Sequence, residues 1–346
     1  MEWQRGASLE GWNSFRVPAT AAYRVRCHHP EELEQLGQHV LLQELALLVL
    51  GRGTNVLFVE DFPGIVCRVE FRGIRCLEDD GDTVCVEVAA GEPWHDFVAY
   101  CLQQGWYGVE NLALIPGTVG AAPVHNIGAY GVELAEVLEG VQVWDMAAGD
   151  YRWLPAHQLG LRYRGSVLRD SLLGRVVITH VRFRLHRRPT SRYEYAELRE
   201  FLRTHEISNP TPHDIFRAIC QLRQRKLPDP AVFPNAGSFF KNPQLSTEQA
   251  EELRTRFPTV PLFQNPDGSY KVPAGWLIEQ CGWKGKRCGP VGTWGSHALV
   301  VVAYSPATGA DILYFATLVW RSVYERFGIA LEPEVLIVPP TAWQPS

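Results

Sequence analysis

A glycine-rich segment, LGRGTNVLF at residues 50–58, sets the strongest limit on the fold, because strand-like apolar residues flank it on both sides. The dinucleotide fingerprint G-x-G-x-x-G needs a helix that opens at its third glycine, and no helical pattern follows here. The segment therefore argues against a Rossmann-type site. Gly51, Gly53, Thr54 and Asn55 would still offer backbone N–H groups and short polar side chains to a pyrophosphate. A plain hairpin turn is the alternative, because glycine and asparagine supply its positive φ angles.

Short apolar runs separated by glycine turns continue through the first half of the chain and predict β-strands. Apolar residues at helical intervals predict a helix over 92–105 that ends at Gly105, and another helix is expected after Pro30. The predicted strands lie in LLVLGRGTNVLFVE, GIVCRVEFRGIRCLED, TVCVEVAAG and VVITHVRFRLH.

Polar and proline-rich clusters interrupt this pattern at 203–216 and predict a domain boundary there. A second α/β unit is expected to follow, so the fold class is α+β with a strand-rich N-terminal unit and a smaller C-terminal one. Its predicted elements are helices near 214–226 and 246–256, a buried strand at 297–304, a helix at 316–328 and a short strand at 331–338.

Composition places the chain among globular proteins, with 346 residues, 46% hydrophobic and 21% charged. No stretch reaches the roughly 18 apolar residues of a membrane span, and the first residues do not resemble a secretory signal. The eight cysteines are scattered without a Cys-x-x-Cys pair, which predicts reduced, buried thiols and no metal site. We therefore expect a cytoplasmic protein.

The distribution of charge is more informative than the net charge of −5. All five lysines lie between 226 and 286, and residues 206–300 hold 11 basic against 8 acidic side chains. Such a local basic excess favours an anionic ligand. Ordinary surface lysines clustered by chance are the alternative. Nucleic acid is a poor candidate, because no basic stripe or binding motif is present.

A second glycine-rich segment, LALIPGTVGAAPVHNIGAYG at 112–131, has little bulk and few charges. A backbone of this kind lets a large flat ligand approach closely, and His125, Asn126 and Tyr130 could supply directional hydrogen bonds. A tight packing junction of small residues is the alternative.

The segment FPNAGSFFKNP, residues 233–243, places one hydroxyl between apolar and polar neighbours. Phe239 and Phe240 suggest a dry wall, whereas Lys241 and Asn242 suggest a polar ligand. Ser238 between them could donate a proton, bind a ligand or only serve a turn.

Five motifs occur in one order: GRGTNVLF, IPGTVGAAPVHNIGAYGVE, KLPDP with NAGSFFKNP, AGWLIEQCGWKG and LEPEV. Together they resemble the longer (type I) form of the UDP-N-acetylenolpyruvoylglucosamine reductase (MurB) family over almost the whole chain. The resemblance implies a vanillyl-alcohol-oxidase (PCMH-type) FAD-binding unit of two α+β subdomains at 1–205, divided near residue 70. It also implies an α/β substrate-binding domain at 206–328, with a C-terminal strand and tail at 329–346.

The implied reaction reduces the enolpyruvyl ether of UDP-N-acetylglucosamine-enolpyruvate to the lactyl ether of UDP-N-acetylmuramate, a peptidoglycan precursor. NADPH would reduce non-covalent FAD, and flavin N5 would deliver hydride to the substrate. Ser238 matches the proton donor and Arg164 the catalytic arginine, whose fork suits a carboxylate. Glu334 matches the catalytic glutamate, which either donates a hydrogen bond while protonated or orients Arg164.

The resemblance also implies binding residues, and we expect a monomer without nucleic-acid or membrane partners. The cofactor residues are Gly51, Gly53, Thr54, Asn55, Ile115, Pro116, Gly117, Thr118, Gly120, Ala121, Asn126, Gly128 and Tyr130. The substrate residues are Tyr195 over the nucleotide, Arg223, Lys226 and Asn242 near the diphosphate, and His297 and Lys284, with Lys271 a further candidate beside Lys284.

Three positions depart from the family pattern or stay ambiguous. Gly165 replaces the acidic residue that usually follows the catalytic arginine, which implies loss of a supporting contact. Phe263 replaces a tyrosine over the substrate and removes a hydroxyl. His297 lies where the family has His or Gln, and a core histidine is equally compatible.

Two rival functions stay open at this level. A flavin oxidase of the same superfamily often tethers FAD through His or Cys, and His125 would be the candidate. A non-catalytic binder of UDP-sugar or flavin is the other, although it would not need Arg164, Ser238 and Glu334 together.

Overall fold

The structure, a computed structural model, describes residues 1–190 and 192–345, without the side chains of 41–43. Contacts within the chain define two compact units, which we describe separately. Unit 1 comprises Met1–Ala7, Ala21–Arg52 and Pro63–Arg225, and unit 2 comprises Ser8–Thr20, Gly53–Phe62 and the chain from Lys226 onward.

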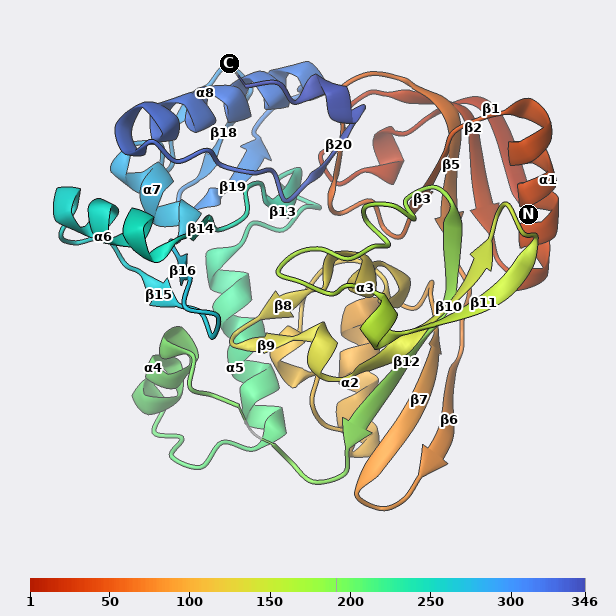
Figure 1. Cartoon of the computed structure of the whole chain (residues 1–346), viewed down its shortest axis with the longest axis horizontal. Helices are drawn as coiled ribbons and strands as arrows, with labels where there is room; N and C mark the ends of the chain where they lie inside the picture. Colours follow the sequence, from red (N-terminus) through yellow and green to blue (C-terminus); the bar gives the residue numbers. More distant parts are fainter. Residues whose placement is uncertain (191, 346) are drawn as a thin grey trace. The chain divides into compact units, whose positions relative to one another are not determined.

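The first sheet of unit 1 has the strand order β1-β2-β5-β3, with α1 beside it (Figure 1). Strands β3 and β5 are parallel, with Leu47 opposite Ile65. Leu33 and Leu36 of α1 are fully buried in the same core as Val25 of β2. The elements are β1 (Glu2–Ser8), β2 (Thr20–Cys27), α1 (Leu33–Gln43), β3 (Leu47–Leu50) and β5 (Phe62–Val69).

The second sheet of unit 1 is antiparallel, in the order β11-β10-β12-β7-β6. Alternate residues of β7 and β12 belong to the core, namely Val84, Val86 and Val88 of β7 and Val181, Phe183 and Leu185 of β12. Helix α2 covers this inner face (Figure 1), and its Phe97 ring lies 5.0 Å from that of Phe183. The elements are β6 (Ile74–Asp79), β7 (Thr83–Ala89), α2 (Trp94–Gln104), β10 (Leu138–Asp145), β11 (Asp150–Pro155) and β12 (Val176–His186).

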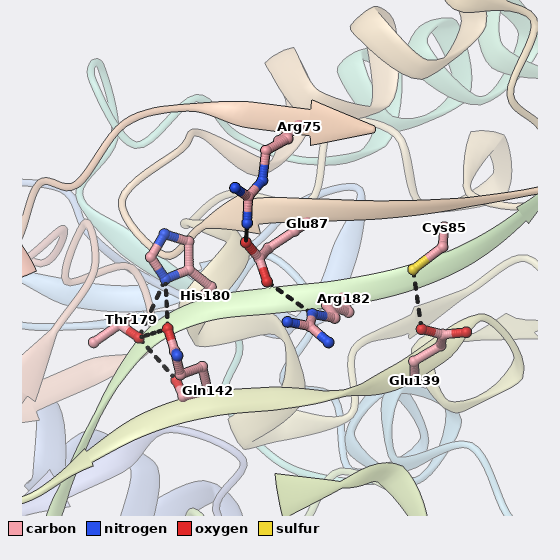
Figure 2. Close-up of polar contacts among 8 residues, drawn as sticks. All are labelled: Arg75, Cys85, Glu87, Glu139, Gln142, Thr179, His180 and Arg182. Carbon is pink, nitrogen blue, oxygen red and sulfur yellow. Dashed lines mark hydrogen bonds and ion pairs between the residues drawn. The ribbon is translucent and has the colours of Figure 1, made fainter. Parts of the chain in front are cut away.

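An ion-pair ladder joins three strands of this sheet (Figure 2). Glu87 of β7 is 8% exposed and accepts hydrogen bonds from Arg75 of β6 at 2.6 Å and Arg182 of β12 at 2.7 Å. Burial opposes ionisation of Glu87, but the bonds from Arg182 and Arg75 prevail and hold its pKa below the ordinary value. The carboxylate therefore stays charged near neutral pH and fixes the register of β6, β7 and β12.

The rest of unit 1 connects these sheets to a long helix. It contains α3 (Ala122–His125), the hairpin β8 (Gly128–Ala129) and β9 (Val132–Glu133), α4 (Ala196–Thr204) and α5 (Pro212–Lys226), whose last residue belongs to unit 2.

Unit 2 centres on an antiparallel sheet of order β13-β19-β18-β17, against which α7 and α8 pack. Thr308 caps α8, because its hydroxyl accepts the Asp311 N–H while the Asp311 carboxylate accepts the Thr308 N–H. The elements are β13 (Asn235–Ser238), α7 (Ala274–Gln280), β17 (Arg287–Cys288), β18 (Val291–Trp294), β19 (His297–Ala303) and α8 (Gly309–Phe327).

Two smaller sheets complete unit 2. One has the order β14-β16-β15, and α6 lies in the chain between β14 and β15. In the other sheet, β20 pairs in parallel with β4. The elements are β4 (Val56–Phe58), β14 (Gln244–Leu245), α6 (Thr247–Arg256), β15 (Phe263–Gln264), β16 (Tyr270–Lys271) and β20 (Leu336–Val338). Within the described chain, no helix combines the length and apolar character of a membrane span.

The contact units do not coincide with the predicted boundaries near 70, 205 and 328. Most of α5 belongs to unit 1, and residues 8–20 and 53–62 belong to unit 2. The predicted boundaries divide the chain by function, and they stay a prediction.

The cysteines are free, as expected, but their predicted burial is wrong for four of the eight. Cys76 and Cys288 lie on short outer strands and are exposed, and Cys220 and Cys281 are half-buried.

Candidate active site

Ser238 lies at a bulge in β13. Asn235 pairs with Val302 of β19, and Ser238 pairs with Val300, so the two strands lose register between these pairs. Gly237 takes a left-handed backbone with φ +71°, which glycine adopts at little cost, and the Asn235 side chain accepts its N–H at 2.9 Å. A bulge re-aims the side chain that follows it, and here that side chain is Ser238.

The two phenylalanines after Ser238 are buried, as the sequence predicted. Phe239 and Phe240 are 0% and 1% exposed, and their rings meet edge-on at 5.0 Å. They exclude water from the segment that follows the serine.

Glu334 lies beside the Ser238 segment. Its backbone N–H donates to the Phe239 carbonyl at 2.8 Å, and the Lys241 N–H donates to the Glu332 carbonyl at 2.8 Å. These bonds hold residues 332–334 along residues 239–241, one residue beyond Ser238. Two predicted catalytic residues, Ser238 and Glu334, are thus brought to neighbouring segments within unit 2.

Asn55 joins the first glycine-rich loop to the same segment. Its side-chain amide donates to the Glu334 carbonyl at 3.3 Å, and its own carbonyl accepts the Leu336 N–H at 3.1 Å. The parallel pairing of β20 with β4 starts directly after these bonds. The end of the predicted cofactor loop and the backbone of Glu334 therefore form one hydrogen-bonded assembly.

Arg164 occupies a tight turn in unit 1. Arg162 and Gly165 exchange both backbone hydrogen bonds at 3.1 Å, which makes Tyr163 and Arg164 the two central residues. Arg164 has φ +53°, the left-handed value that the second central position of a type II turn requires and glycine usually fills. A large side chain held in this conformation is strained, and such strain concentrates at functional sites.

The second glycine-rich loop holds this arginine. Arg164 Nη2 donates to the Gly128 carbonyl at 2.7 Å, and a Cβ at Gly128 would lie 3.1 Å from Arg164 Nη1. Asn126 donates to the Arg162 carbonyl at 3.2 Å and to Glu133 at 2.9 Å, and it accepts the Ala135 N–H at 3.1 Å. The Asn126 amide therefore supports the turn of Arg164, a use that sequence reasoning did not foresee.

The departure at Gly165 has a local explanation. A Cβ at this position would lie 3.1 Å from the guanidinium carbon of Arg162, so the absent side chain leaves room for that guanidinium. Arg162 in turn pairs with Asp170 at 2.5 Å.

Tyr130, Tyr195 and Arg223 gather near Arg164 in unit 1. The rings of Tyr130 and Tyr195 meet edge-on at 5.4 Å. Burial lowers the pKa of Arg223, the Tyr130 hydroxyl opposes that shift, and Arg164 adds to it. Burial likewise raises the pKa of Tyr130, which keeps its hydroxyl a donor at neutral pH. Arg223 Nε is buried and bonds to no described residue, which suits a polar ligand.

The two glycine-rich loops meet within unit 1. A Cβ at Gly51 would overlap Thr118 Oγ1, so these loops approach more closely than any other residue at 51 would allow. The N–H groups of Val119, Gly120 and Ala121 donate to Glu92, Ala90 and Thr118. Gly120 and Ala121 would therefore serve a cofactor by close packing rather than by donating these N–H groups.

Two family models match this chain. One is described as "FAD binding domain" and matches residues 21–155, and the other is described as "UDP-N-acetylenolpyruvoylglucosamine reductase, C-terminal domain" and matches residues 229–338. A reductase of that name from Chromobacterium violaceum is 45% identical over 98% of this chain and 99% of its own. The chain belongs to the UDP-N-acetylenolpyruvoylglucosamine reductase family.

Further relatives agree with this reductase family. A Pseudomonas fluorescens member is 43% identical over 96% of this chain and 97% of its own. The crystal structure of the reductase (MurB) from Thermus caldophilus is 25% identical, with a TM-score of 0.64 over 97% of this chain and 99% of that chain. The predicted α+β fold, with a PCMH-type FAD-binding unit and a C-terminal domain, is confirmed. The chain is a flavoprotein oxidoreductase.

The residues present fit the FAD of this reductase family. Gly51 has no side chain where it faces the Thr118 hydroxyl, so backbone and one short polar side chain meet there, a surface that suits a pyrophosphate. His125, the candidate for a covalent tether, has its Nδ1 within 3.2 Å of Arg169 Nη1. The individual cofactor contacts stay predictions.

Gly51→Ala is expected to weaken FAD binding about tenfold or more, because the added methyl forces the two loops apart at a cost of about 1–3 kcal/mol. Titration of apoprotein with FAD, followed by quenching of flavin fluorescence, measures the dissociation constant. Gly37→Ala in α1 is the matched control, because its Cβ would lie at an ordinary 3.7 Å from Trp144. It should keep the wild-type affinity. If Gly51→Ala bound FAD as tightly as Gly37→Ala does, the close approach of the two loops at Gly51 would not matter for FAD binding.

The predicted substrate residues of unit 2 lie on separate elements. Asn242 accepts the Ala274 N–H at 2.9 Å and so caps α7, and Lys284 pairs with Glu279 at 2.9 Å. His297 Nδ1 accepts the Leu299 N–H at 3.4 Å, which gives this half-buried histidine a local structural role. Their contacts with substrate stay predictions.

Phe263 and Lys271 lie opposite each other on β15 and β16. Phe263 is 55% exposed, a large fraction for a phenylalanine, and no hydroxyl replaces the one that its family position usually carries. Lys226 ends α5, one turn beyond Arg223.

Sequence reasoning missed Asn235, which shapes the bulge of Ser238. It is 3% exposed, and its amide also donates to the Phe233 carbonyl at 2.7 Å. The available signal was an asparagine two residues before a glycine, the spacing of a side-chain-to-backbone turn.

Proposed function

We propose that this chain reduces UDP-N-acetylglucosamine-enolpyruvate to UDP-N-acetylmuramate with NADPH as reductant. The observation that carries the proposal is the pairing of the Ser238 and Glu334 segments through the Glu334 N–H and the Phe239 carbonyl, at 2.8 Å. It puts the Ser238 hydroxyl, the proton donor that we propose, and the Glu334 carboxyl group on adjacent backbones beside two buried rings, in a chain that also matches an FAD-binding domain.

The glycine-rich loops at Gly51 and Thr118 would hold FAD, which would supply the hydride chemistry between NADPH and the terminal carbon of the enolpyruvyl double bond. Ser238 Oγ then gives its proton to the neighbouring carbon, which completes the lactyl ether. The serine alkoxide regains a proton from water. A hydroxyl can donate only to a strongly basic carbon, so the burial of Phe239 and Phe240 matters for this step.

Arg164 would bind the carboxylate of the substrate, into which negative charge spreads after hydride arrives. The guanidinium is held in advance by the Gly128 carbonyl at 2.7 Å, which lowers the reorganisation that the transition state demands. Glu334 would either donate a hydrogen bond to this carboxylate while protonated or orient Arg164.

For the nucleotide we propose Arg223 and Lys226 at the diphosphate, one turn apart on α5, with Tyr195 over the base or ribose. The basic excess of residues 206–300 supports a ligand with two phosphates. We further propose non-covalent FAD, a monomeric enzyme and a cytoplasmic location.

The test uses purified protein with its bound flavin under anaerobic conditions. NADPH is added to bleach the flavin band, then UDP-N-acetylglucosamine-enolpyruvate is added while absorbance is followed. We expect rapid reoxidation and a lactyl product by mass, with parallel lines in initial-rate plots because NADP⁺ leaves before the enolpyruvyl substrate enters. A reduced flavin that ignores this substrate but reacts quickly with air would favour an oxidase instead. A requirement for both substrates bound together would refute the ping-pong order.

A further inference from the structure

We propose that Asn111 is a positioning residue that holds Tyr195, and through it the nucleotide end of the substrate, against the loop of Tyr130. This inference rests on the proposed function, in which Tyr195 covers the nucleotide. Asn111 lies outside the two glycine-rich motifs, 50–58 and 112–131, and sequence analysis assigned it no role. We infer its role from the hydrogen bonds that its side chain makes.

Asn111 stands on a rigid platform. Residues 110–112 form a short 3-10 helix in which Glu110 and Asn111 are each 2% exposed and Leu112 is fully buried. Trp94 Nε1 donates to the Leu112 carbonyl at 2.8 Å, and the Glu110 carboxylate accepts the Gly108 N–H at 2.7 Å. A side chain on this platform has little freedom to follow its partners if they move.

The amide of Asn111 bridges two segments that are distant in sequence. Its Nδ2 donates to the Tyr130 carbonyl at 3.0 Å and to the Arg192 carbonyl at 2.9 Å. A primary amide has two N–H groups, so each carbonyl takes one of them. Tyr130 has φ +49°, an uncommon value for a tyrosine, and the bond to its carbonyl helps to hold that conformation.

The bond to the Arg192 carbonyl fixes the backbone of the segment that leads into Tyr195. Tyr195 lies three residues later, at the N-cap of α4, and the residue is 47% exposed. Its ring contact with Tyr130 at 5.4 Å joins the same two segments that Asn111 bridges. Arg192 also pairs with Glu136, so a second tether lies at the same residue. Without Asn111, only the Tyr130 ring contact and the Arg192–Glu136 ion pair would hold this segment. The substrate would then have to supply part of the ordering of Tyr195, which reduces affinity.

The test is a double-mutant cycle on the holoenzyme with Asn111→Ala, Tyr195→Ala and the double variant. Asn111→Ala is expected to raise KM for the UDP-sugar substrate about tenfold, with kcat within twofold. In the Tyr195→Ala background the same change should raise KM less than twofold, because its target is absent. A full tenfold effect in that background, or a loss in kcat with KM unchanged, would overturn the proposal.

Gln142→Leu is the matched control for losing a side-chain amide. Gln142 accepts hydrogen bonds from Thr179 and contacts His180 at 3.0 Å in the sheet of Figure 2, and it touches neither Tyr130 nor Arg192 in the described structure. The loss of the Gln142 amide should lower the melting temperature and leave KM for the UDP-sugar substrate unchanged. A KM shift equal to that of Asn111→Ala would reduce the Asn111 effect to general destabilisation and overturn the proposal.

A second readout needs no turnover and so separates failure of this proposal from failure of the proposed function. Trypsin cleavage after Arg192 is expected to be several-fold faster in Asn111→Ala than in the wild type. If Asn111→Ala does not fold, Asn111→Ser serves, because its hydroxyl is too short to reach both carbonyls. An unchanged cleavage rate would sink the proposal even if the enzyme proved active on another substrate.

Discussion

Ser238→Ala is expected to slow reoxidation of the reduced flavin by the enolpyruvyl substrate about 10³-fold, while reduction by NADPH keeps its wild-type rate. The two half-reactions differ in what they need, because only the second places a proton on carbon. The alanine keeps the left-handed Gly237 and the pairing opposite Val300, so the fold should survive. Anaerobic stopped-flow absorbance measures both rates in one preparation.

Ser246→Ala is the matched control for this prediction. Ser246 lies in the same unit, and its hydroxyl caps α6 by accepting the Gln249 N–H at 3.3 Å. The variant should lose about 1 kcal/mol of its free energy of unfolding. The rates of both half-reactions should stay at their wild-type values. Ser238→Ala with a reoxidation rate within threefold of wild type would remove Ser238 as the proton donor.

Arg164→Gly is expected to lower kcat/KM about 10³-fold and yet to stabilise the fold by about 1 kcal/mol. The loss follows from removing the fork that we propose binds the substrate carboxylate as charge builds on it. The gain follows from φ +53°, which strains arginine and suits glycine at this position of the turn. Urea unfolding gives the free energy of unfolding, and steady-state rates give the activity.

Arg162→Ala provides the comparison for Arg164. Arg162 lies in the same turn and pairs with Asp170, which is 49% exposed, so its side chain should matter little to rate or stability. A loss of both stability and activity in Arg164→Gly would show that the arginine supports the turn rather than the chemistry.

Local patterns predicted most elements that carry apolar periodicity. The run VVITHVRFRLH becomes β12 with the predicted bounds, and the helix over 92–105 ends at Gly105 with φ +66°. Helix α8 begins seven residues before its predicted start, and the missed signal was the capping box of Thr308 and Asp311. The strand expected at 331–338 shrinks to Leu336–Val338, because residues 332–334 pair with 239–241 only through an isolated bridge at Pro333 while 336–338 pair with β4.

Elements without periodicity were not predicted. The strands β1 and β11 expose most of their residues, so neither shows the alternation that betrays a half-buried strand. Helix α4 was missed although Leu198, Phe201 and Leu202 have helical spacing, because charged residues surround them.

At the site, sequence named residues but not their partners. The joining of the Ser238, Glu334 and Asn55 segments depends on hydrogen bonds between parts of the chain that are remote in sequence, and no local pattern encodes these. The roles of the Asn111 and Asn126 amides likewise depend on which carbonyl groups they bond to in the fold, and the sequence does not show this. Identity at a motif position is readable from sequence, whereas a tertiary hydrogen bond is not.

The bond between Asn55 and Glu334 joins residues that are 279 positions apart in the chain. Strand β4 can therefore pair with β20 only after nearly all of the intervening chain has been synthesised. Until then the apolar Val56–Phe58 edge has no partner strand and is open to wrong pairing. We therefore expect a chain that ends before Leu336 to leave this edge exposed and to aggregate more readily than the full chain.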